Sequence, residues 1–97
     1  MRLRYSAHAE EKVRTRKLSR VQIRLVLEKP GRKFYDVASN ANIALKEVGL
    51  LGGRVGLVVV FTVSREGTSV VTVYPVKNIH GEIRRKVNSG RWIVLRG

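Results

Sequence analysis

The segment RVGLVVVFTV, residues 54–63, decides the fold. It is almost wholly apolar and rich in β-branched side chains, which is typical of a strand buried on both faces. A similar run, VVTVYPV at residues 70–76, follows the polar segment SREGTS at residues 64–69. The two runs predict a hairpin in the middle of an antiparallel sheet, with Pro75 marking the end of regular pairing.

Three further strands are predicted before this hairpin. The segment KFYDVAS, residues 33–39, ends at the turn-prone SNAN, and IALKEVGLL, residues 43–51, ends at the Gly52–Gly53 pair. At the start of the chain, RLRY at residues 2–5 alternates in polarity and predicts a short first strand. The sheet is therefore expected to hold four to five strands.

Two helices are predicted between the first strand and the others. Residues 7–17 contain no Gly or Pro and follow Ser6, which stands where an N-cap would. A second helix is expected after Ser19, which forms a Ser-x-x-Gln capping box with Gln22, and to end at EKPG, residues 28–31. This order of elements predicts an α+β fold in which two N-terminal helices pack on the sheet.

The last part of the chain, residues 77–97, is expected to be a basic C-terminal extension of a single domain. A length of 97 residues suits one compact domain. Within the extension, GEIRRKVNS at residues 81–89 fits a short helix, and RWIVL at residues 91–95 fits a last strand. Trp92 is assigned to the core because apolar residues follow it, with stacking on a nucleic-acid base as the alternative.

Composition narrows the class of protein. The chain has no cysteine, which excludes disulfides and thiolate metal sites and fits a cytoplasmic protein. The N-terminus resembles no signal peptide, and the longest apolar run, residues 56–61, is too short to cross a bilayer. Two histidines, His8 and His80, and scattered acids show no metal-ligand spacing, and no nucleotide-binding loop is present. We therefore expect a soluble protein without metal, cofactor or membrane association.

Charge is the strongest compositional signal. Twenty Lys and Arg residues against seven Asp and Glu give a net charge of +13. The excess is +8 in residues 1–33 and +5 in residues 77–97, whereas residues 34–76 are neutral. Because neutralised phosphates release counterions, this pattern favours a nucleic acid as the partner. An anionic membrane surface and an acidic protein are the alternatives.

His8, Lys12 and Arg16 are spaced four residues apart, so on a helix they span an arc of about 80°. Imidazole exchanges a proton near neutral pH, and the two cations can hold a phosphate. This combination suits metal-independent RNA cleavage by a 2′-hydroxyl. The alternative is a capping or packing histidine beside a solvated, charged helix face.

Thr72 and Tyr74 are expected to point to one side of their strand, opposite to Val71 and Val73. If the valines face the helices, the two hydroxyls face outward across the sheet. Tyr74 can then stack on a base or pass a proton. An ordinary half-exposed strand residue is the alternative.

Two parts of the chain together resemble a known family over about residues 4–76. Ser6, His8 and Ala9 match an opening Ser-x-His-Ala motif, and VVTVYP at residues 70–75 matches a closing Val-x-Thr-Val-Tyr-Pro strand. The intervening Arg-hydrophobic pair and Arg-Gly-Ile-Ser motif are represented by Lys12 and Val13 and by Arg16, Lys17, Leu18 and Ser19. The chain thus resembles small prokaryotic domains of unknown function that are distantly related to RelE/ParE-type toxins.

The resemblance implies a RelE-like fold, with two helices against a curved antiparallel sheet, and one cluster formed by His8, Lys12, Arg16 and Tyr74. Toxins of that fold cleave messenger RNA, some of them on the ribosome, while others act on gyrase. Lys12 stands where the family has arginine and loses the bidentate grip on phosphate. The extension after residue 76 lies outside the resemblance.

These observations lead to one leading hypothesis and two alternatives. The leading hypothesis is an RNA-binding, toxin-like endoribonuclease whose partners are RNA or the ribosome and an acidic antitoxin. His8 is the expected acid or base, Lys12 and Arg16 stabilise phosphate charge, and Tyr74 stacks or assists proton transfer. The residues expected to contact nucleic acid are Arg14, Arg20, Arg24, Arg84, Arg85 and Lys86. A non-catalytic nucleic-acid-binding module and a domain that docks on an acidic protein are the alternatives, and the oligomeric state is left open.

Overall fold

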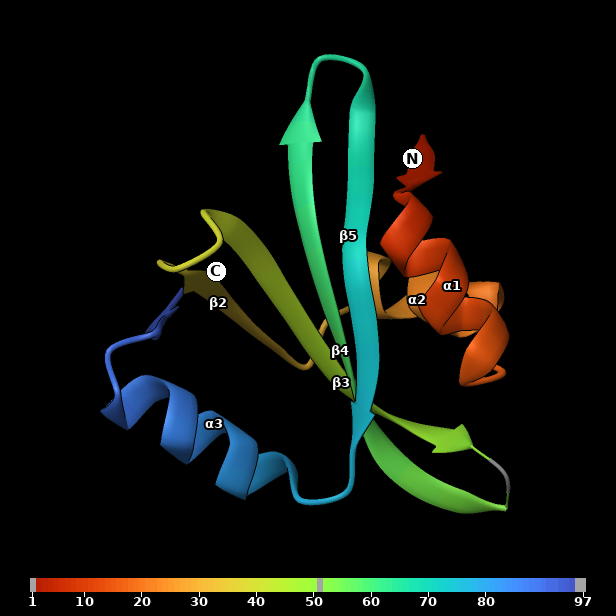
Figure 1. Cartoon of the computed structure of the whole chain (residues 1–97). Coiled ribbons are helices and arrows are strands. Elements are labelled where there is room, and N and C mark those ends of the chain that lie inside the picture. Colours follow the sequence, from red (N-terminus) through yellow and green to blue (C-terminus); the bar gives the residue numbers. More distant parts are fainter. Residues whose placement is uncertain (1, 51, 96–97) are drawn as a thin grey trace.

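The computed structural model describes residues 2–50 and 52–95, and these residues form three helices and one six-stranded sheet (Figure 1). In chain order the elements are β1 (Leu3–Tyr5), α1 (Ala7–Thr15), α2 (Arg20–Glu28), β2 (Arg32–Asp36), β3 (Ala41–Leu50), β4 (Gly53–Ser64), β5 (Gly67–Val76), α3 (Ile79–Asn88) and β6 (Trp92–Val94). The strands are arranged in the order β1-β5-β4-β3-β2-β6. None of the described helices is long and apolar enough to span a membrane.

The predicted hairpin is formed by β4 and β5. Residues 56–60 of β4 are buried, which confirms the expectation of a central strand covered on both faces. On β5, a β-bulge interrupts the register, because Phe61 pairs with Val70 and Val60 pairs with Thr72. Val71 is thus the extra residue, and its side chain lies on the same side as Thr72 instead of beside Val73.

The N-caps of α1 and α2 form as predicted. The Ser6 hydroxyl accepts a hydrogen bond from the Ala9 N–H at 3.0 Å, and the Ser19 hydroxyl accepts one from the Gln22 N–H at 3.2 Å. The Gln22 side chain does not complete the capping box, because its amide donates to the Gly49 carbonyl at 2.6 Å. Gln22 therefore ties α2 to β3.

The two faces of the sheet are covered by different helices. On one face, α1 and α2 bury Ala9, Val13 and Ile23 in a core that includes Val73 of β5. The other face carries a second core, against which the apolar residues of α3 pack. Figure 1 shows α1 and α2 on one side of the strands and α3 on the other.

This architecture confirms the α+β class and the packing of two N-terminal helices on the sheet. It differs from the prediction in size, since there are six strands and three helices among the described residues. The direction of one strand also differs from the prediction of an antiparallel sheet. β1 runs parallel to β5, while the remaining strand pairs are antiparallel. The sheet is therefore mixed and not purely antiparallel.

The segment after residue 76, expected to be an extension, supplies the helix and the strand that its sequence suggested. Asn78 caps α3 by accepting a hydrogen bond from the Gly81 N–H at 2.9 Å. The start of α3 lies against β4 at Gly56, where a Cβ atom would overlap the side chain of Ile79. After the helix, β6 pairs with β2, and Trp92 stacks on Phe34 with ring centroids 4.9 Å apart. Trp92 is therefore a core residue, as predicted.

Candidate functional site

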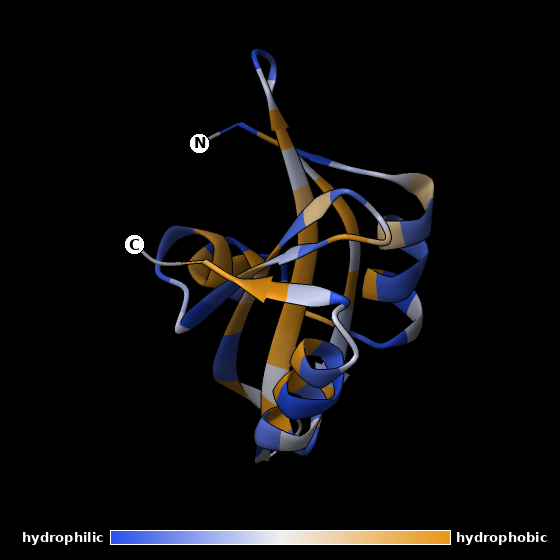
Figure 2. Cartoon of the chain, turned by 90° about the vertical axis from the view of Figure 1, so that its left-hand side faces the viewer, coloured by the Kyte–Doolittle hydropathy of each residue, from blue (hydrophilic) through white to orange (hydrophobic). Residues whose placement is uncertain are grey.

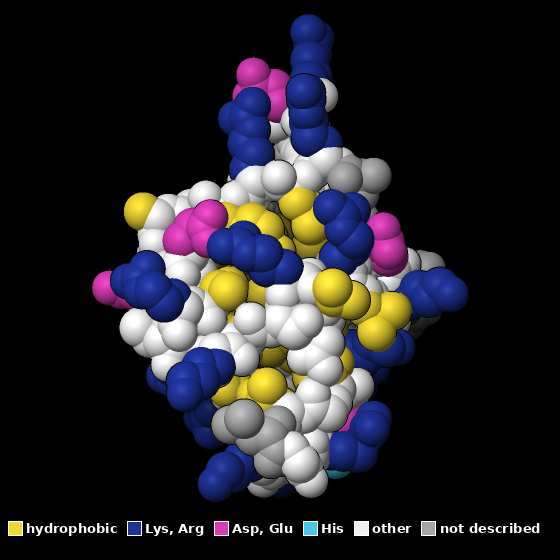
Figure 3. Space-filling view, turned by 90° about the vertical axis from the view of Figure 1, so that its right-hand side faces the viewer, with side chains coloured by type: hydrophobic (Ala, Val, Ile, Leu, Met, Phe, Trp, Pro, Cys, Tyr) yellow, Lys and Arg dark blue, Asp and Glu magenta, His cyan; other side chains and the backbone are white. Residues whose placement is uncertain are grey.

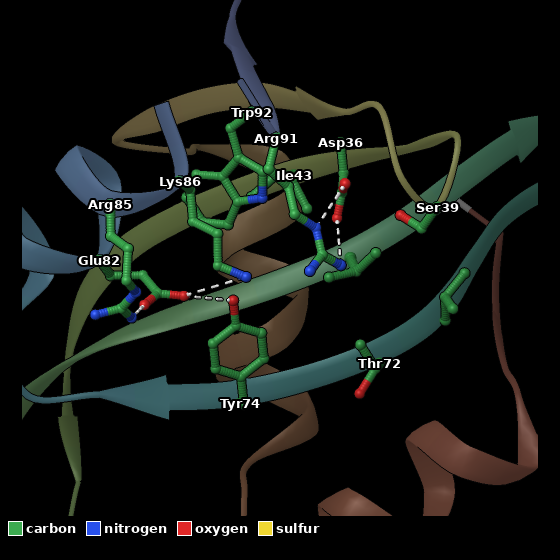
Figure 4. A pocket seen from close by; sticks show the side chains of 12 residues that line it. Asp36, Ser39, Ile43, Thr72, Tyr74, Glu82, Arg85, Lys86, Arg91 and Trp92 are labelled. Carbon is green, nitrogen blue, oxygen red and sulfur yellow. Dashed lines mark hydrogen bonds and ion pairs between the residues drawn. The ribbon is translucent and has the colours of Figure 1, made fainter. Parts of the chain in front are cut away.

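A pocket of about 490 Å³ lies between α3, the β2–β6 edge and the sheet face that α3 covers (Figure 4). Strands β3, β4 and β5 form its floor with Ile43, Val60, Val71, Thr72 and Tyr74, and its rim carries Asp36, Ser39, Glu82, Arg85, Lys86, Arg91 and Trp92. The floor is largely apolar, while the rim supplies three cations and two carboxylates. Such a mixture suits a ligand that has both an anionic and an apolar part.

The Arg91–Asp36 ion pair forms one side of the pocket. Arg91 Nε donates to Asp36 Oδ1 at 3.2 Å, and a second guanidinium nitrogen lies 3.4 Å from Oδ2. Burial opposes ionisation of Asp36, but hydrogen bonds from Arg91 and from the Ala38 N–H outweigh it and lower the pKa of the carboxyl group. Asp36 therefore stays charged and holds the half-exposed Arg91 at the rim.

Glu82 organises the opposite side of the pocket. Its side chain is only about 6% exposed. It accepts a hydrogen bond from the Tyr74 hydroxyl at 2.9 Å and forms ion pairs with Arg85 and Lys86, the latter at 3.9 Å. Burial and the adjacent Glu82 carboxylate raise the pKa of Tyr74, so the phenol remains protonated and continues to donate. In this arrangement Tyr74 connects β5 to α3.

Trp92 contributes a hydrogen-bond donor without a protein partner. The residue is 2% exposed, and its Nε1–H donates to no group among the described residues. The Lys86 ammonium lies 5.6 Å from the centroid of the indole ring. Because Nε1 itself is buried, this N–H belongs to the wall of the pocket, and the cations on the rim are the groups that an anionic ligand reaches.

The structure does not bring the predicted catalytic residues together. His8 and Lys12 belong to α1, which packs through Ala9 and Val13 on the sheet face that includes Val73. Tyr74 follows Val73 in an extended strand and therefore points to the opposite face, into the α3 pocket. His8 and Tyr74 therefore share no hollow among the described residues. The prediction that they belong to one cluster with Lys12 and Arg16 is wrong, because α1 and Tyr74 lie on opposite faces of the sheet. Arg16 also lies elsewhere, beside Lys77 at a separate hollow of about 300 Å³.

The predicted nucleic-acid contacts are divided between the two sides of the molecule. On the side of α1 and α2, Arg20 pairs with Glu10 and lies over the Tyr5 ring, and Arg24 pairs with Glu28 at 3.8 Å. Arg14 is exposed on α1, and Figure 3 shows Lys and Arg side chains dispersed over that side of the molecule among apolar groups.

On the other side, α3 carries Arg84, Arg85 and Lys86. Arg84 is exposed, and Arg85 and Lys86 line the pocket. The two groups of cations thus belong to helices on opposite faces of the sheet (Figure 1).

Sequence reasoning missed Asp36, Glu82 and Arg91 as parts of the site. Glu82 had a recognisable signal in the sequence. It is the single acidic residue of the segment 77–97, and it lies two residues before the cationic run Arg84–Lys86. An isolated acid within a cationic helix indicates a structural or chemical role. Asp36 and Arg91 offered no such signal, since they are 55 residues apart and only the β2–β6 pairing brings them together.

Comparison of the chain with protein-family models, with curated proteins and with solved structures found no match.

Proposed function

We propose that this protein binds RNA and that the α3 pocket holds a backbone phosphate with its attached nucleoside. The proposal rests on one observation above all: the pocket brings the cations Arg85, Lys86 and Arg91 together around an apolar floor. The apolar floor and Tyr74 supply a surface for the uncharged part of a nucleotide.

The overall charge supports the same proposal. Six of the seven acidic residues form ion pairs with Lys or Arg, and the net charge of +13 remains. Phosphate contacts by the surplus cations release counterions and supply affinity independent of sequence. The α3 pocket then fixes where along the surface the RNA is held most tightly.

The proposal is tested with fluorescein-labelled single-stranded RNA, whose anisotropy reports binding at several salt concentrations. Arg85→Gln is compared with Arg54→Gln, because both arginines pair with a glutamate and their side chains are similarly exposed, at 70% and 64%. We expect Arg85→Gln to weaken binding about five- to tenfold, equivalent to about 1 kcal/mol, and to reduce the salt slope by about 0.7. We expect Arg54→Gln to change affinity less than about twofold. Equal losses for both variants would contradict binding at the pocket.

Metal-independent RNA cleavage is the second candidate function, and the observation that favours it is the buried Glu82 carboxylate, which pairs with Arg85 and Lys86 in a pocket that Arg91 also lines. In this scheme Glu82, in place of His8, accepts the proton of the attacking 2′-hydroxyl, and Arg85 and Arg91 hold the phosphate. As the 2′-oxygen bonds to phosphorus, the bond from phosphorus to the 5′-oxygen breaks, and the leaving 5′-oxygen takes a proton from the Lys86 ammonium. The toxin-like role inferred from the resemblance stays a prediction.

Cleavage is tested by incubating labelled RNA with the protein in EDTA. If the pocket is catalytic, wild type and His8→Ala both cut the RNA while Glu82→Gln does not. Loss of cutting in His8→Ala alone would instead support the α1 site. Background cutting by all three proteins would remove the enzyme hypothesis and leave RNA binding. Circular dichroism establishes that each variant is folded.

A further inference from the structure

The outer edge of β6 has features that RNA binding does not explain. Among the residues that the structure describes, β6 is the last strand of the sheet and pairs only with β2, through Phe34↔Val94, Tyr35↔Ile93 and Asp36↔Trp92. In Figure 2 it crosses the side of the molecule that faces the viewer, at the border of the sheet, and its ribbon is coloured as hydrophobic. Within the described part of the chain, the strand therefore has one paired edge and one edge without a neighbouring strand, called the free edge below.

The free edge presents backbone hydrogen-bonding groups. At its two ends the strand is bound to β2: the Val37 N–H donates to the Arg91 carbonyl at 2.9 Å, and the Leu95 N–H donates to the Lys33 carbonyl at 3.1 Å. Successive residues of an antiparallel strand direct these groups to opposite edges. The N–H and C=O groups of Trp92 and Val94 consequently point away from β2, toward the position of an additional strand.

The side chains along this edge are apolar. Ile93 is 53% exposed, Val94 47% and Leu95 38%, and Val37, the residue after β2, is 47% exposed. Natural edge strands usually carry charges or prolines that prevent pairing with other chains. Three consecutive exposed apolar residues are therefore unusual in a chain of which 28% is charged.

Cations lie at both ends of this apolar edge. Arg91 immediately precedes β6 and remains about half exposed despite its pairing with Asp36. At the other end, Leu95 borders a hollow of about 430 Å³ that Arg32 and Lys33 also line. The carboxylate in that hollow belongs to Glu28, which pairs with Arg24. The edge thus has an apolar middle with cationic residues at each end.

We propose that the free edge of β6 binds an extended segment of an acidic partner protein, which adds to the sheet as a seventh strand. Backbone hydrogen bonds to Trp92 and Val94 supply affinity, and apolar side chains of the segment pack on Ile93 and Val94. Carboxylates at the ends of the segment face Arg91 and Lys33.

A second copy of this chain is a poor occupant of the edge. Antiparallel pairing of β6 with itself places Arg91 of each copy near the Lys33 end of the other. Like charges across such a contact are unfavourable, and each copy brings a net charge of +13. An acidic segment meets the same apolar residues without this repulsion.

The proposal is tested by titrating the ¹⁵N-labelled full chain with a blocked peptide, Asp-Val-Thr-Val-Thr-Val-Asp, and measuring amide hydrogen exchange. When free peptide reaches about nine times Kd, we expect the exchange of the Trp92 and Val94 amides to slow about tenfold. The same peptide with Lys in place of Asp should bind at least about tenfold more weakly, and a peptide N-methylated at alternate residues should give no protection.

Two variants of the chain complete the test. Ile93→Lys should weaken peptide binding at least about tenfold, whereas Val63→Lys, at an exposed apolar position on β4, should leave it unchanged.

Equal binding of the N-methylated peptide would overturn strand addition. A concentration-dependent dimer of the wild type that Ile93→Lys abolishes would assign the edge to a second copy. Displacement of the peptide by RNA with the same protected amides would assign it to nucleic acid. The peptide arms use the wild-type chain, so the test holds even if Ile93→Lys fails to fold.

Discussion

Tyr74→Phe tests the link between the sheet and α3 that shapes the pocket. The substitution removes the hydroxyl that donates to Glu82 at 2.9 Å and keeps the ring, so no large cavity forms. A hydrogen bond to a charged acceptor contributes about 1.5–3 kcal/mol. Glu82 retains Arg85 and Lys86 as partners, which reduces the loss. We therefore expect the free energy of unfolding to fall by about 1–2 kcal/mol, and Tm to fall by about 4–12 °C.

Urea unfolding measures this effect, because the fluorescence of the single tryptophan, Trp92, reports on the same region. Tyr35→Phe is the matched control, since the Tyr35 hydroxyl also donates to a side chain, Asn40, at 3.1 Å but in an exposed position. We expect the control to lose less than about 0.5 kcal/mol. Equal losses for the two variants would show that the Tyr74–Glu82 bond does not hold α3 to the sheet.

Three further predictions concern the packing of α3 on the sheet, the core under α2 and the Asp36 ion pair. Gly56→Ala places a methyl group against Ile79, so we expect a loss of about 1–3 kcal/mol in urea unfolding; an unchanged midpoint would mean that α3 does not pack there. Ile23→Ala in the core under α2 should lose about 2–5 kcal/mol, and Val21→Ala on the exposed side of the same helix less than about 0.5 kcal/mol; similar losses would contradict the assigned helix face. The folded-state pKa of Asp36 lies below the unfolded value of 3.8, so its stabilising contribution is complete above that pH and is lost as pH falls through the folded pKa. Urea midpoints between pH 2 and 6 should therefore fall less steeply for Asp36→Asn than for wild type, and parallel curves would exclude this contribution.

Local sequence signals predicted the elements of the fold. Ser6 and Ser19 precede helices that they do cap, and the apolar run of residues 54–63 belongs to the strand that is buried on both sides. These features depend on side chains acting on their own backbone or on neighbours in the same strand. They can therefore be recognised without knowing the rest of the molecule.

The site was less predictable because it depends on which face each element covers. The alternation of β5 placed Val73 and Tyr74 on opposite sides, but the sequence did not reveal that α3, and not α1, covers the side of Tyr74. The bulge at Val71 shifted the alternation of β5 by one residue and had no local signal. Residues such as Asp36 and Arg91 meet only after the C-terminal strand has joined the sheet.

The central claim is that RNA is held at the α3 pocket and not on α1. The most direct measurement is an NMR titration of ¹⁵N-labelled protein with single-stranded RNA, because the single tryptophan gives one indole N–H signal. We expect the Trp92 indole signal and the amides of Arg85 and Lys86 to shift together and to saturate at one RNA concentration. Shifts confined to residues 8–16, with an unchanged indole signal, would contradict the claim and return the interaction to the face that carries His8.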